Sequence, residues 1–449
     1  MAETISKKKA TRRSTTRSSP SKNRAVYIVD GSRTPQLKAR GKPGPFNAAN
    51  LAVACGRPLL ARQPFEPTEL DEVIVGCVMP GPDEANIARV IALRLECGVR
   101  VPAWTVQRNC ASGMQALDSA YKDIVSGRAD LVLAGGVEAM SHAPVLLNND
   151  MVAWLGAWMG AKTAMQRIKV LGRLRPGHLK PIIGLLRGLT DPVVGLSMGQ
   201  TAENLAYRFG IKRSEMDAFA MRSHQRLAAA QDAGYLQEVE TLYDTAGRFY
   251  EHDDGLRRES SMEQLGKLRP VFDKPFGSVT AGNSAQVTDG AALMILASED
   301  AVEKHQLKVL GEIKDAQWAG LEPAQMGLGP VHAITPILQR NKLALADVDY
   351  WEINEAFAAQ VLGCLRAWDD EAYCSEELGL KKPLGQLDES RLNVDGGGVS
   401  LGHPVGASGA RIVLHLLHVL ERHDAHTGIA SLCIGGGQGG AMLVERHTG

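Results

Sequence analysis

The sequence repeats one order of elements in its two halves. Each half contains an apolar run, then a turn followed by a helix, and then a second apolar run that ends in two glycines. These segments are 70–76 and 346–354, the turns at Cys110 and His403, and 129–136 and 429–436. Apolar runs that alternate with helices are typical of an α/β protein whose parallel sheet is covered on both faces. The repetition therefore predicts two related sheets with equivalent turns at the same edge.

A chain of 449 residues is too long for one small core, and the repeated pattern suggests where its domains divide. We assign residues 25–140 and 287–306 to an N-terminal domain and residues 307–449 to a C-terminal domain. Residues 141–286 break the pattern and are expected to form a loop domain. The 50 basic and 50 acidic residues cancel, so we expect no nucleic-acid partner. No apolar run is long enough to span a bilayer.

Residues 1–24 differ in composition from the rest of the chain. They contain eight Lys or Arg residues and a single acidic residue, Glu3, among Ser, Thr and Ala, which predicts a disordered basic tail. A mitochondrial transit peptide has a similar composition, but this segment lacks the bulky apolar face of such a helix. We therefore expect a cytoplasmic protein, with a mitochondrial location as the alternative.

A basic amphipathic insert occupies residues 151–192 of the loop domain. Apolar residues alternate there with cations such as Arg167, Lys169 and Arg173. A stretch of this kind can lie on a membrane surface or bind a partner protein. A lid or a dimerisation arm with a solvated basic face is an equally good interpretation of the pattern.

Cys110 follows a strand and precedes a helix, within the run Asn-Cys-Ala-Ser-Gly. The unpaired N–H groups and positive dipole of a helix start favour a thiolate, so we expect a reactive cysteine there. Its small neighbours would let a bulky substrate approach the sulfur. The alternative is a buried apolar cysteine, which most free cysteines are. The seven cysteines include no Cys-x-x-Cys pair, which argues against zinc, an iron–sulfur cluster or a disulfide framework.

Three further turns carry polar or reactive side chains. His403 lies among glycines at a helix start, which favours a base with a pKa near neutrality over a structural histidine. Asn354 follows a strand, where its amide would either face a site or cap a helix. If the two halves are duplicates, these turns and the turn at Cys433 lie close to Cys110.

The last glycine-rich turn imitates a dinucleotide-binding motif. Gly435, Gly437 and Gly440 have the G-x-G-x-x-G spacing, but that motif requires a helix directly after the turn. Residues 441–446 have the pattern of a strand instead. We therefore reject a nucleotide-binding function for this turn.

Four of these motifs, in their order along the chain, resemble the active-site loops of the thiolases. They are Asn109–Gly113, Asn354–Phe357, Gly402–Pro404 and Cys433–Gly435, and the similarity extends from about Ala25 to the end. Each motif alone is a weak signal, but four in order on a duplicated α/β pattern are specific. The resemblance implies a thiolase-like fold, with duplicated βαβαβ halves in α-β-α-β-α layers. It also implies an acyltransferase that cleaves 3-ketoacyl-CoA with CoA into acyl-CoA and acetyl-CoA.

The resemblance also implies a role for each site residue. Cys110 would be the nucleophile that carries the acyl group as a thioester, His403 its base, and Cys433 a second acid and base. Asn354, through a water molecule, and the N–H of Gly435 would stabilise oxyanions. The residues expected to bind substrate are Met198, Ser284, Met326 and Phe357. Coenzyme A is a substrate in this scheme, and no metal or cofactor is expected.

Departures from the family pattern bear on the subtype. Short-chain biosynthetic thiolases have a histidine where this chain has Ser197, and Asn-Ala-Ser where it has Asn283-Ser284-Ala285. The insert is similar to the thiolase β-subunits of trifunctional fatty-acid-oxidation complexes, which pair with a hydratase/dehydrogenase α-subunit. We therefore expect a degradative 3-ketoacyl-CoA thiolase of β-oxidation, built on a homodimer or tetramer. A biosynthetic acetoacetyl-CoA thiolase is the close alternative.

Two more distant alternatives share the fold. A ketoacyl-ACP synthase would have His or Asn in place of Cys433 and would lack the Asn-Glu-Ala-Phe run. An inactive thiolase-like binding protein would often lose the nucleophile or the His-Pro turn, and this chain retains both.

Overall fold

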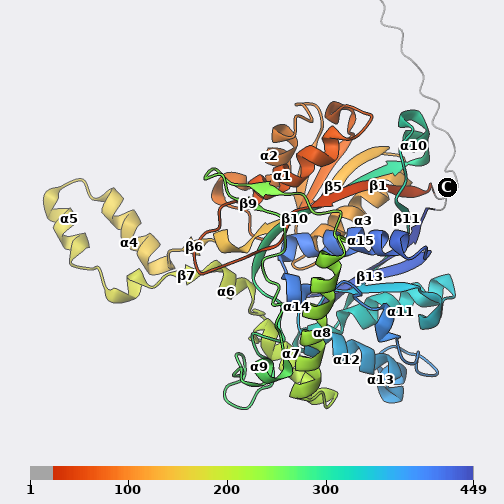
Figure 1. The fold of residues 1–449 in the computed structure, drawn as a ribbon. Helices are drawn as coiled ribbons and strands as arrows, with labels where there is room; N and C mark the ends of the chain where they lie inside the picture. Colours follow the sequence, from red (N-terminus) through yellow and green to blue (C-terminus); the bar gives the residue numbers. More distant parts are fainter. Residues whose placement is uncertain (1–23, 448–449) are drawn as a thin grey trace, which may run out of the picture.

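The computed structural model describes residues 24–447, and Figure 1 shows their fold. Nearly all of the expected basic tail lies outside these residues. Its last member, Arg24, is described and donates hydrogen bonds to Asp130 and Asp300, at 2.6 and 2.9 Å. Arg24 is therefore attached to the folded body. In the described part of the chain, no helix is long and apolar enough to cross a membrane.

Ten strands of the described residues form a central sheet. Their order is β12-β13-β14-β11-β1-β10-β5-β3-β4, with β2 beside β10. The strands are β1 (Val26–Arg33), β2 (Leu37–Lys38), β3 (Glu72–Gly76), β4 (Ala103–Val106), β5 (Leu131–Ala139), β10 (Thr288–Ser298), β11 (Gly311–Gly320), β12 (Tyr350–Ile353), β13 (Thr427–Ile434) and β14 (Gln438–Arg446).

The strand order is the same in the two halves. The first half has the order β4-β3-β5-β10-β1, and the last four of these strands correspond to β12-β13-β14-β11 of the second half. In the second half, Leu392 takes the place of β4, because it forms a parallel bridge with Trp351. The helix that follows is α3 (Ser112–Val125) in the first half and α15 (Val405–Arg422) in the second. This order confirms the predicted duplication.

The expectation of a parallel sheet is wrong for much of its width. β3 is parallel to β4 and β5, and β12 is parallel to β13, whereas the other pairs are antiparallel. A strand covered on both faces is a continuous apolar run whether it is parallel or antiparallel to its neighbours, so the pattern could not distinguish the two directions. The two expected sheets are also joined, because Tyr27 and Ile28 pair with β11. This pairing satisfies the backbone of two strands that would otherwise be edges.

Side-chain alternation along the strands shows how the layers stack. In β5, Leu133 faces an outer core formed with α1 and α2, whereas Val132 faces an inner core shared with α3 and α15. In β13, Ile429 faces a second outer core with α11 and α12, and Ala430 faces the same inner core. The layers therefore run α-β-α-β-α, as expected, with α3 and α15 in the middle (Figure 1).

The two middle helices cross very closely. A Cβ atom on Gly113 would lie 2.9 Å from the backbone N of Ala410, and one on Gly409 would lie 2.7 Å from the backbone N of Met114. Any larger residue at either position would separate the two helices. Because this contact lies within the first turns, it brings together the starts of α3 and α15, and with them the turns of Cys110 and His403.

The remaining helices cover the outer faces or belong to the segment between β5 and β10. They are α1 (Ala48–Ala61), α2 (Ile87–Arg94), α7 (Met198–Arg208), α8 (Arg213–Asp232), α9 (Met262–Gly266), α10 (Glu299–His305), α11 (Gly329–Asn341), α12 (Ala358–Asp369), α13 (Glu371–Glu376) and α14 (Gly398–Leu401). A short hairpin of β8 (Leu242–Tyr243) and β9 (Phe249–Tyr250) also lies in that segment.

Residues 145–188 form an arm that projects from the body, drawn in yellow in Figure 1. It consists of β6 (Val145–Leu146), α4 (Asn149–Gly160), α5 (Ala164–Leu171), β7 (Ile182–Ile183) and α6 (Gly184–Gly188). Its base is closed by antiparallel pairing of Val145 with Ile183 and of Leu146 with Ile182. Only Ala161 and Val170 are buried within the arm, so it has almost no core of its own.

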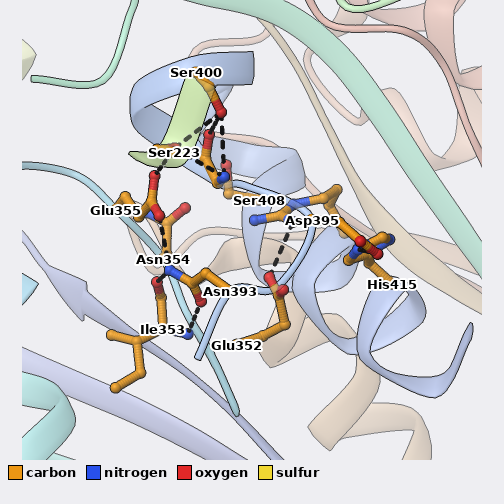
Figure 2. A network of polar contacts seen from close by, with 12 residues as sticks. Ser223, Glu352, Ile353, Asn354, Glu355, Asn393, Asp395, Ser400, Ser408 and His415 are labelled. Atoms are coloured by element: carbon orange, nitrogen blue, oxygen red, sulfur yellow. Dashed lines mark hydrogen bonds and ion pairs between the residues drawn. The ribbon is translucent and has the colours of Figure 1, made fainter. Parts of the chain in front are cut away.

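A buried charge network holds α15 to the rest of the body, and Figure 2 shows two of its members, His415 and Asp395. His415 has Glu238 at 3.0 Å from Nδ1 and Asp395 at 3.1 Å from Nε2. Arg33 also pairs with Glu238, and Arg422 with Asp395. Burial alone would lower the pKa of His415, but the two carboxylates raise it to about 10. His415 is therefore an imidazolium at neutral pH.

We expect His415→Gln to destabilise the protein at pH 6 by roughly 3 kcal/mol, the scale of breaking a buried ion pair. The folded pKa lies above the unfolded value of about 6.5, so the contribution of His415 is complete below that pH and is lost as the pH rises towards 10. The difference in Tm between wild type and variant should therefore shrink over this range. Thermal unfolding measured from pH 6 to 10 tests this, and a difference independent of pH would contradict an ionised His415.

Candidate active site

A cavity of about 350 Å³ lies where the turns of the two halves meet. Cys110, His403 and Cys433 all line it. Cys110 lies between β4 and α3, and His403 lies two residues before α15. Cys433 lies within β13, one residue before its end. The structure thus brings together the three reactive side chains that the sequence predicted to lie close to one another.

The four residues expected to bind substrate also line this cavity. They are Met198, Ser284, Met326 and Phe357. The hydroxyl of Ser284 donates a hydrogen bond to the carbonyl O of Thr280 at 2.7 Å, so it is held by the backbone. Phe272 packs edge-on against Phe357, with ring centroids 5.9 Å apart.

Leu186, Leu189 and Phe272 line the cavity as well, although the sequence did not identify them. The two leucines lie in and directly after α6, at the base of the arm. They belong to the insert and to none of the motifs, and only their position in the fold places them at the site. Their apolar side chains make this wall of the cavity suitable for a hydrocarbon.

Cys110 lies two residues before α3 and not in its first turn. Asn109 has a φ of +44°, and α3 begins at Ser112 after the cap residue Ala111. The side-chain amide of Asn109 donates to the carbonyl O of Gly435 at 2.8 Å, which joins the Cys110 turn to the turn after β13. Cys110 is partly exposed, whereas the other six cysteines are buried.

The expectation of a lowered pKa at Cys110 is wrong. Burial raises the pKa of its thiol, although a hydrogen bond from the backbone N–H of Gly435 favours the thiolate. Desolvation by an apolar cavity outweighs the nearby N–H groups. Cys110 is therefore a thiol at neutral pH and needs a base to become a nucleophile.

His403 is the basic side chain that lines the cavity together with Cys110. Its Nδ1 lies 2.6 Å from the hydroxyl of Ser408, and the side-chain N of Asn354 lies 3.4 Å from each ring nitrogen. Burial, followed by the charge of Arg411, lowers the pKa of His403 to about 4. The expected pKa near neutrality is therefore wrong, but a neutral imidazole is the form that can accept a proton.

Asn354 follows β12 and is not a helix cap, because α12 begins at Ala358 with Phe357 as its cap residue. Its side chain contacts His403, and its Oδ1 is buried without a hydrogen-bond partner. An unpartnered buried oxygen is costly unless water or a ligand satisfies it. This feature suits the predicted role of Asn354 in holding a water molecule.

Cys433 is buried, with 1% of its surface exposed. Burial, followed by the proximity of Cys110, raises the pKa of Cys433 well above its ordinary value. Cys433 thus retains its proton until a strongly basic group appears beside it. That property fits a proton donor better than a second nucleophile.

The turns of Asn354 and His403 are held by a buried network that the sequence did not predict (Figure 2). Glu355 accepts hydrogen bonds from Ser223 at 2.6 Å, from Asn393 at 2.9 Å and from the backbone N of Val399 at 3.2 Å. Asn393 also exchanges two hydrogen bonds with the backbone of Ile353, both at 2.9 Å. In the sequence, the Glu of the Asn-Glu-Ala-Phe motif was the one signal that could have indicated this network.

We expect alkylation of Cys110 by iodoacetamide to speed up by about tenfold per pH unit up to at least pH 9, because only the thiolate reacts and the pKa is raised. Mass spectrometry of the labelled protein measures this rate. Cys110→Ala is the control for labelling elsewhere. A plateau near pH 7 would instead indicate a thiolate–imidazolium pair with His403.

Comparisons with known proteins agree with this arrangement. Residues 26–300 match the thiolase N-terminal domain, and residues 307–446 match the thiolase C-terminal domain. A beta-ketoadipyl-CoA thiolase of Pseudomonas knackmussii is 38% identical over 430 residues, which covers 94% of this chain and all of the relative. The mitochondrial 3-ketoacyl-CoA thiolase of Rattus norvegicus is 38% identical over 427 residues, covering 94% of this chain and 98% of the relative.

Solved structures are similar over the same extent. Human mitochondrial 3-ketoacyl-CoA thiolase in complex with CoA has a TM-score of 0.81 at 37% identity, over 94% of this chain and 98% of that one. An acetyl-CoA acetyltransferase from Syntrophomonas wolfei has a TM-score of 0.83 at 34% identity, over 95% and 100% of the two chains. The family domains, the relatives and the structures cover both duplicated halves together, and the chain belongs to the thiolase family.

Proposed function

We propose that this thiolase cleaves 3-ketoacyl-CoA with coenzyme A in fatty-acid β-oxidation. The observation that carries the proposal is the meeting of Cys110, His403 and Cys433 at one apolar cavity. This arrangement offers a nucleophile, a base and a second proton carrier, which the cleavage of a carbon–carbon bond next to a thioester requires.

The first half-reaction forms an acyl-enzyme. His403 takes the proton of Cys110, and the sulfur attacks the 3-keto carbon of the substrate. The bond between C2 and C3 then breaks, and its electron pair stays on C2 as the enolate of acetyl-CoA. Cys433 donates a proton to C2, which releases acetyl-CoA and leaves the acyl group on Cys110.

The second half-reaction transfers the acyl group to coenzyme A. The thiol of CoA gives its proton to Cys433 and attacks the acyl carbon, while His403 returns its proton to Cys110 as that sulfur leaves. The backbone N–H groups of Cys110 and Gly435 form one oxyanion site, and His403 with a water held by Asn354 forms another. Every step transfers a proton or an acyl group, so the scheme calls for no metal or redox cofactor.

The lining of the cavity supports an apolar acyl group. None of the lining residues is ionised at neutral pH, including His403, and Leu186, Leu189 and Phe272 form a hydrocarbon wall. A beta-ketoadipyl group ends in a carboxylate, which would be buried there without a cation. We therefore favour unsubstituted 3-ketoacyl chains, with acetoacetyl-CoA as the second candidate.

We expect kcat/KM for thiolysis to rise from acetoacetyl-CoA to longer 3-ketoacyl-CoA, because each added methylene enters apolar surroundings. Beta-ketoadipyl-CoA should be slower than an apolar substrate of equal length by at least roughly 100-fold. Disappearance of the 3-ketoacyl-CoA absorbance measures both. Cys110→Ala should lower every rate by at least about 1,000-fold. Substantial turnover by that variant would refute the mechanism, and a preference for acetoacetyl-CoA would refute the degradative subtype.

The arm supports a second proposal, contact with an anionic membrane surface. Between residues 151 and 190 there are seven cations and no acidic residue, and all seven are exposed. They are Lys162, Arg167, Lys169, Arg173, Arg175, Lys180 and Arg187. Cations near an anionic bilayer contribute about 1 kcal/mol each.

Apolar side chains accompany these charges. Twelve of the 23 large apolar side chains that are exposed in the described residues lie between Val145 and Leu186. Met159 is 80% exposed, and Met165 and Ile168 are each 63% exposed. An exposed surface that is both basic and apolar fits the boundary between lipid headgroups and acyl chains.

The arm can be removed at its base without disturbing the cavity. Leu146 and Ile182 are paired across the base, so an Asn-Gly turn can join them in place of residues 147–181. The shortened protein keeps Leu186 and Leu189. We expect it to retain thiolysis of acetoacetyl-CoA and to lose sedimentation with vesicles of phosphatidylcholine and phosphatidylglycerol.

A variant with fewer cations separates the contribution of charge to vesicle binding from the contribution of the exposed apolar area. Replacing Lys162, Arg167, Lys169 and Arg173 by Gln should weaken vesicle binding by at least about tenfold. The same change at four exposed cations of the body is the matched control; they are Arg57, Lys267, Lys304 and Lys308. Wild-type protein that does not bind these vesicles, or binding that is unchanged by the deletion, would reject the lipid role and favour a protein partner such as an α-subunit.

Oligomeric state and compartment are further parts of the proposal. We propose a homodimeric core, since β4 ends the central sheet and its Trp104 is 37% exposed. We also propose a cytoplasmic enzyme. The mitochondrion is the alternative, because the similar proteins from rat and human are mitochondrial.

A further inference from the structure

The environment of His403 determines which of its nitrogens carries the proton. Nδ1 lies 2.6 Å from the hydroxyl of Ser408. Ser408 is 1% exposed and His403 8% exposed, so bulk water does not compete for this contact. A buried neutral imidazole has one N–H, and its position is set by the partner of each nitrogen.

A count of protons assigns the donor in this contact. The Ser408 hydroxyl also lies 3.1 Å from the carbonyl O of Pro404, one helical turn earlier. The carbonyl can only accept, whereas Nδ1 can donate or accept, so both contacts are hydrogen bonds only when the hydroxyl proton points to Pro404. The lone pairs of Ser408 are then free to accept a proton, and Nδ1 of His403 is the donor that faces them.

The other neighbours of His403 do not replace Ser408. The side-chain N of Asn354 is 3.4 Å from both ring nitrogens, which is too far for a strong hydrogen bond to either. Among the described residues, no carboxylate forms an ion pair or a hydrogen bond with His403, and the charged group that acts on it is Arg411. Ser408 is thus the strongest polar contact of the ring.

We propose that Ser408 is a positioning residue that holds His403 in the Nδ1–H tautomer, so that Nε2 carries the free lone pair that takes the proton of Cys110. The inference depends on the proposed reaction, in which His403 takes the thiol proton. It assigns to Ser408 the place that a carboxylate holds in a Ser-His-Asp triad. A neutral hydroxyl orients the ring but stabilises the imidazolium much less than a carboxylate would. His403 therefore returns its proton readily in the second half-reaction.

The first test is the tautomer itself, read by NMR from the nitrogen shifts of protein labelled with [15N]histidine. The His403 signals are assigned by their absence in His403→Asn. We expect wild type to carry the proton on Nδ1, and Ser408→Ala to show both tautomers. A wild-type proton on Nε2, or an unchanged tautomer in Ser408→Ala, would overturn the inference. This measurement needs no turnover, so its failure is distinguishable from failure of the proposed reaction.

The second test is kinetic. Ser408→Ala should lower kcat for thiolysis by roughly 10- to 100-fold with little change in KM, and Ser408→Thr, which keeps the hydroxyl, should recover much of the loss. Ser119→Ala is the matched control, because Ser119 donates to the carbonyl O of Gln115 one turn earlier on α3, at 2.8 Å, away from the cavity. A wild-type kcat in Ser408→Ala, or an equal loss in Ser119→Ala, would reject the role.

Discussion

The close crossing of α3 and α15 is the contact on which the rest of this structure depends. Gly113 and Gly409 let the two backbones meet within the first turns of both helices, between the two halves of the sheet. The first half supplies Cys110, and the second half supplies His403 and Cys433. The crossing joins them, so that a cysteine from the first half and a histidine from the second share one cavity. Duplication thus provided two similar turns, and close packing made one site of them.

Burial of this site governs its chemistry more than helix dipoles do. The same desolvation that raises the pKa of Cys110 and Cys433 lowers that of His403, since it disfavours every charged form. The resting site is therefore neutral, with protons on both thiols and a free lone pair on the imidazole. In the proposed mechanism, charge develops only when substrate is bound and the oxyanion donors can receive it.

Charge lies instead in two places away from the cavity. Within the body, His415 joins Glu238 and Asp395, and so fastens α15 and the turn before His403. On the arm, seven exposed cations and many exposed apolar side chains face solvent without a core behind them. The first arrangement fixes the catalytic turns. The second is the surface that we propose contacts an anionic membrane, and the base of the arm contributes Leu186 and Leu189 to the cavity wall.

The pattern of the sequence by itself determined the duplication and the meeting of the Cys110, Asn354, His403 and Cys433 turns. The five-layer arrangement and the four residues expected to bind substrate came from the resemblance to the thiolases. Strand direction, the pKa of each group, Phe272 and the two arm leucines at the cavity, and the supports Ser408 and Asn393 were decided only by the tertiary structure. The physical reason is that a strand buried on both faces is apolar throughout, so the sequence pattern does not reveal whether it is parallel or antiparallel to its neighbours. Desolvation and side-chain partners likewise depend on residues brought together from distant parts of the chain.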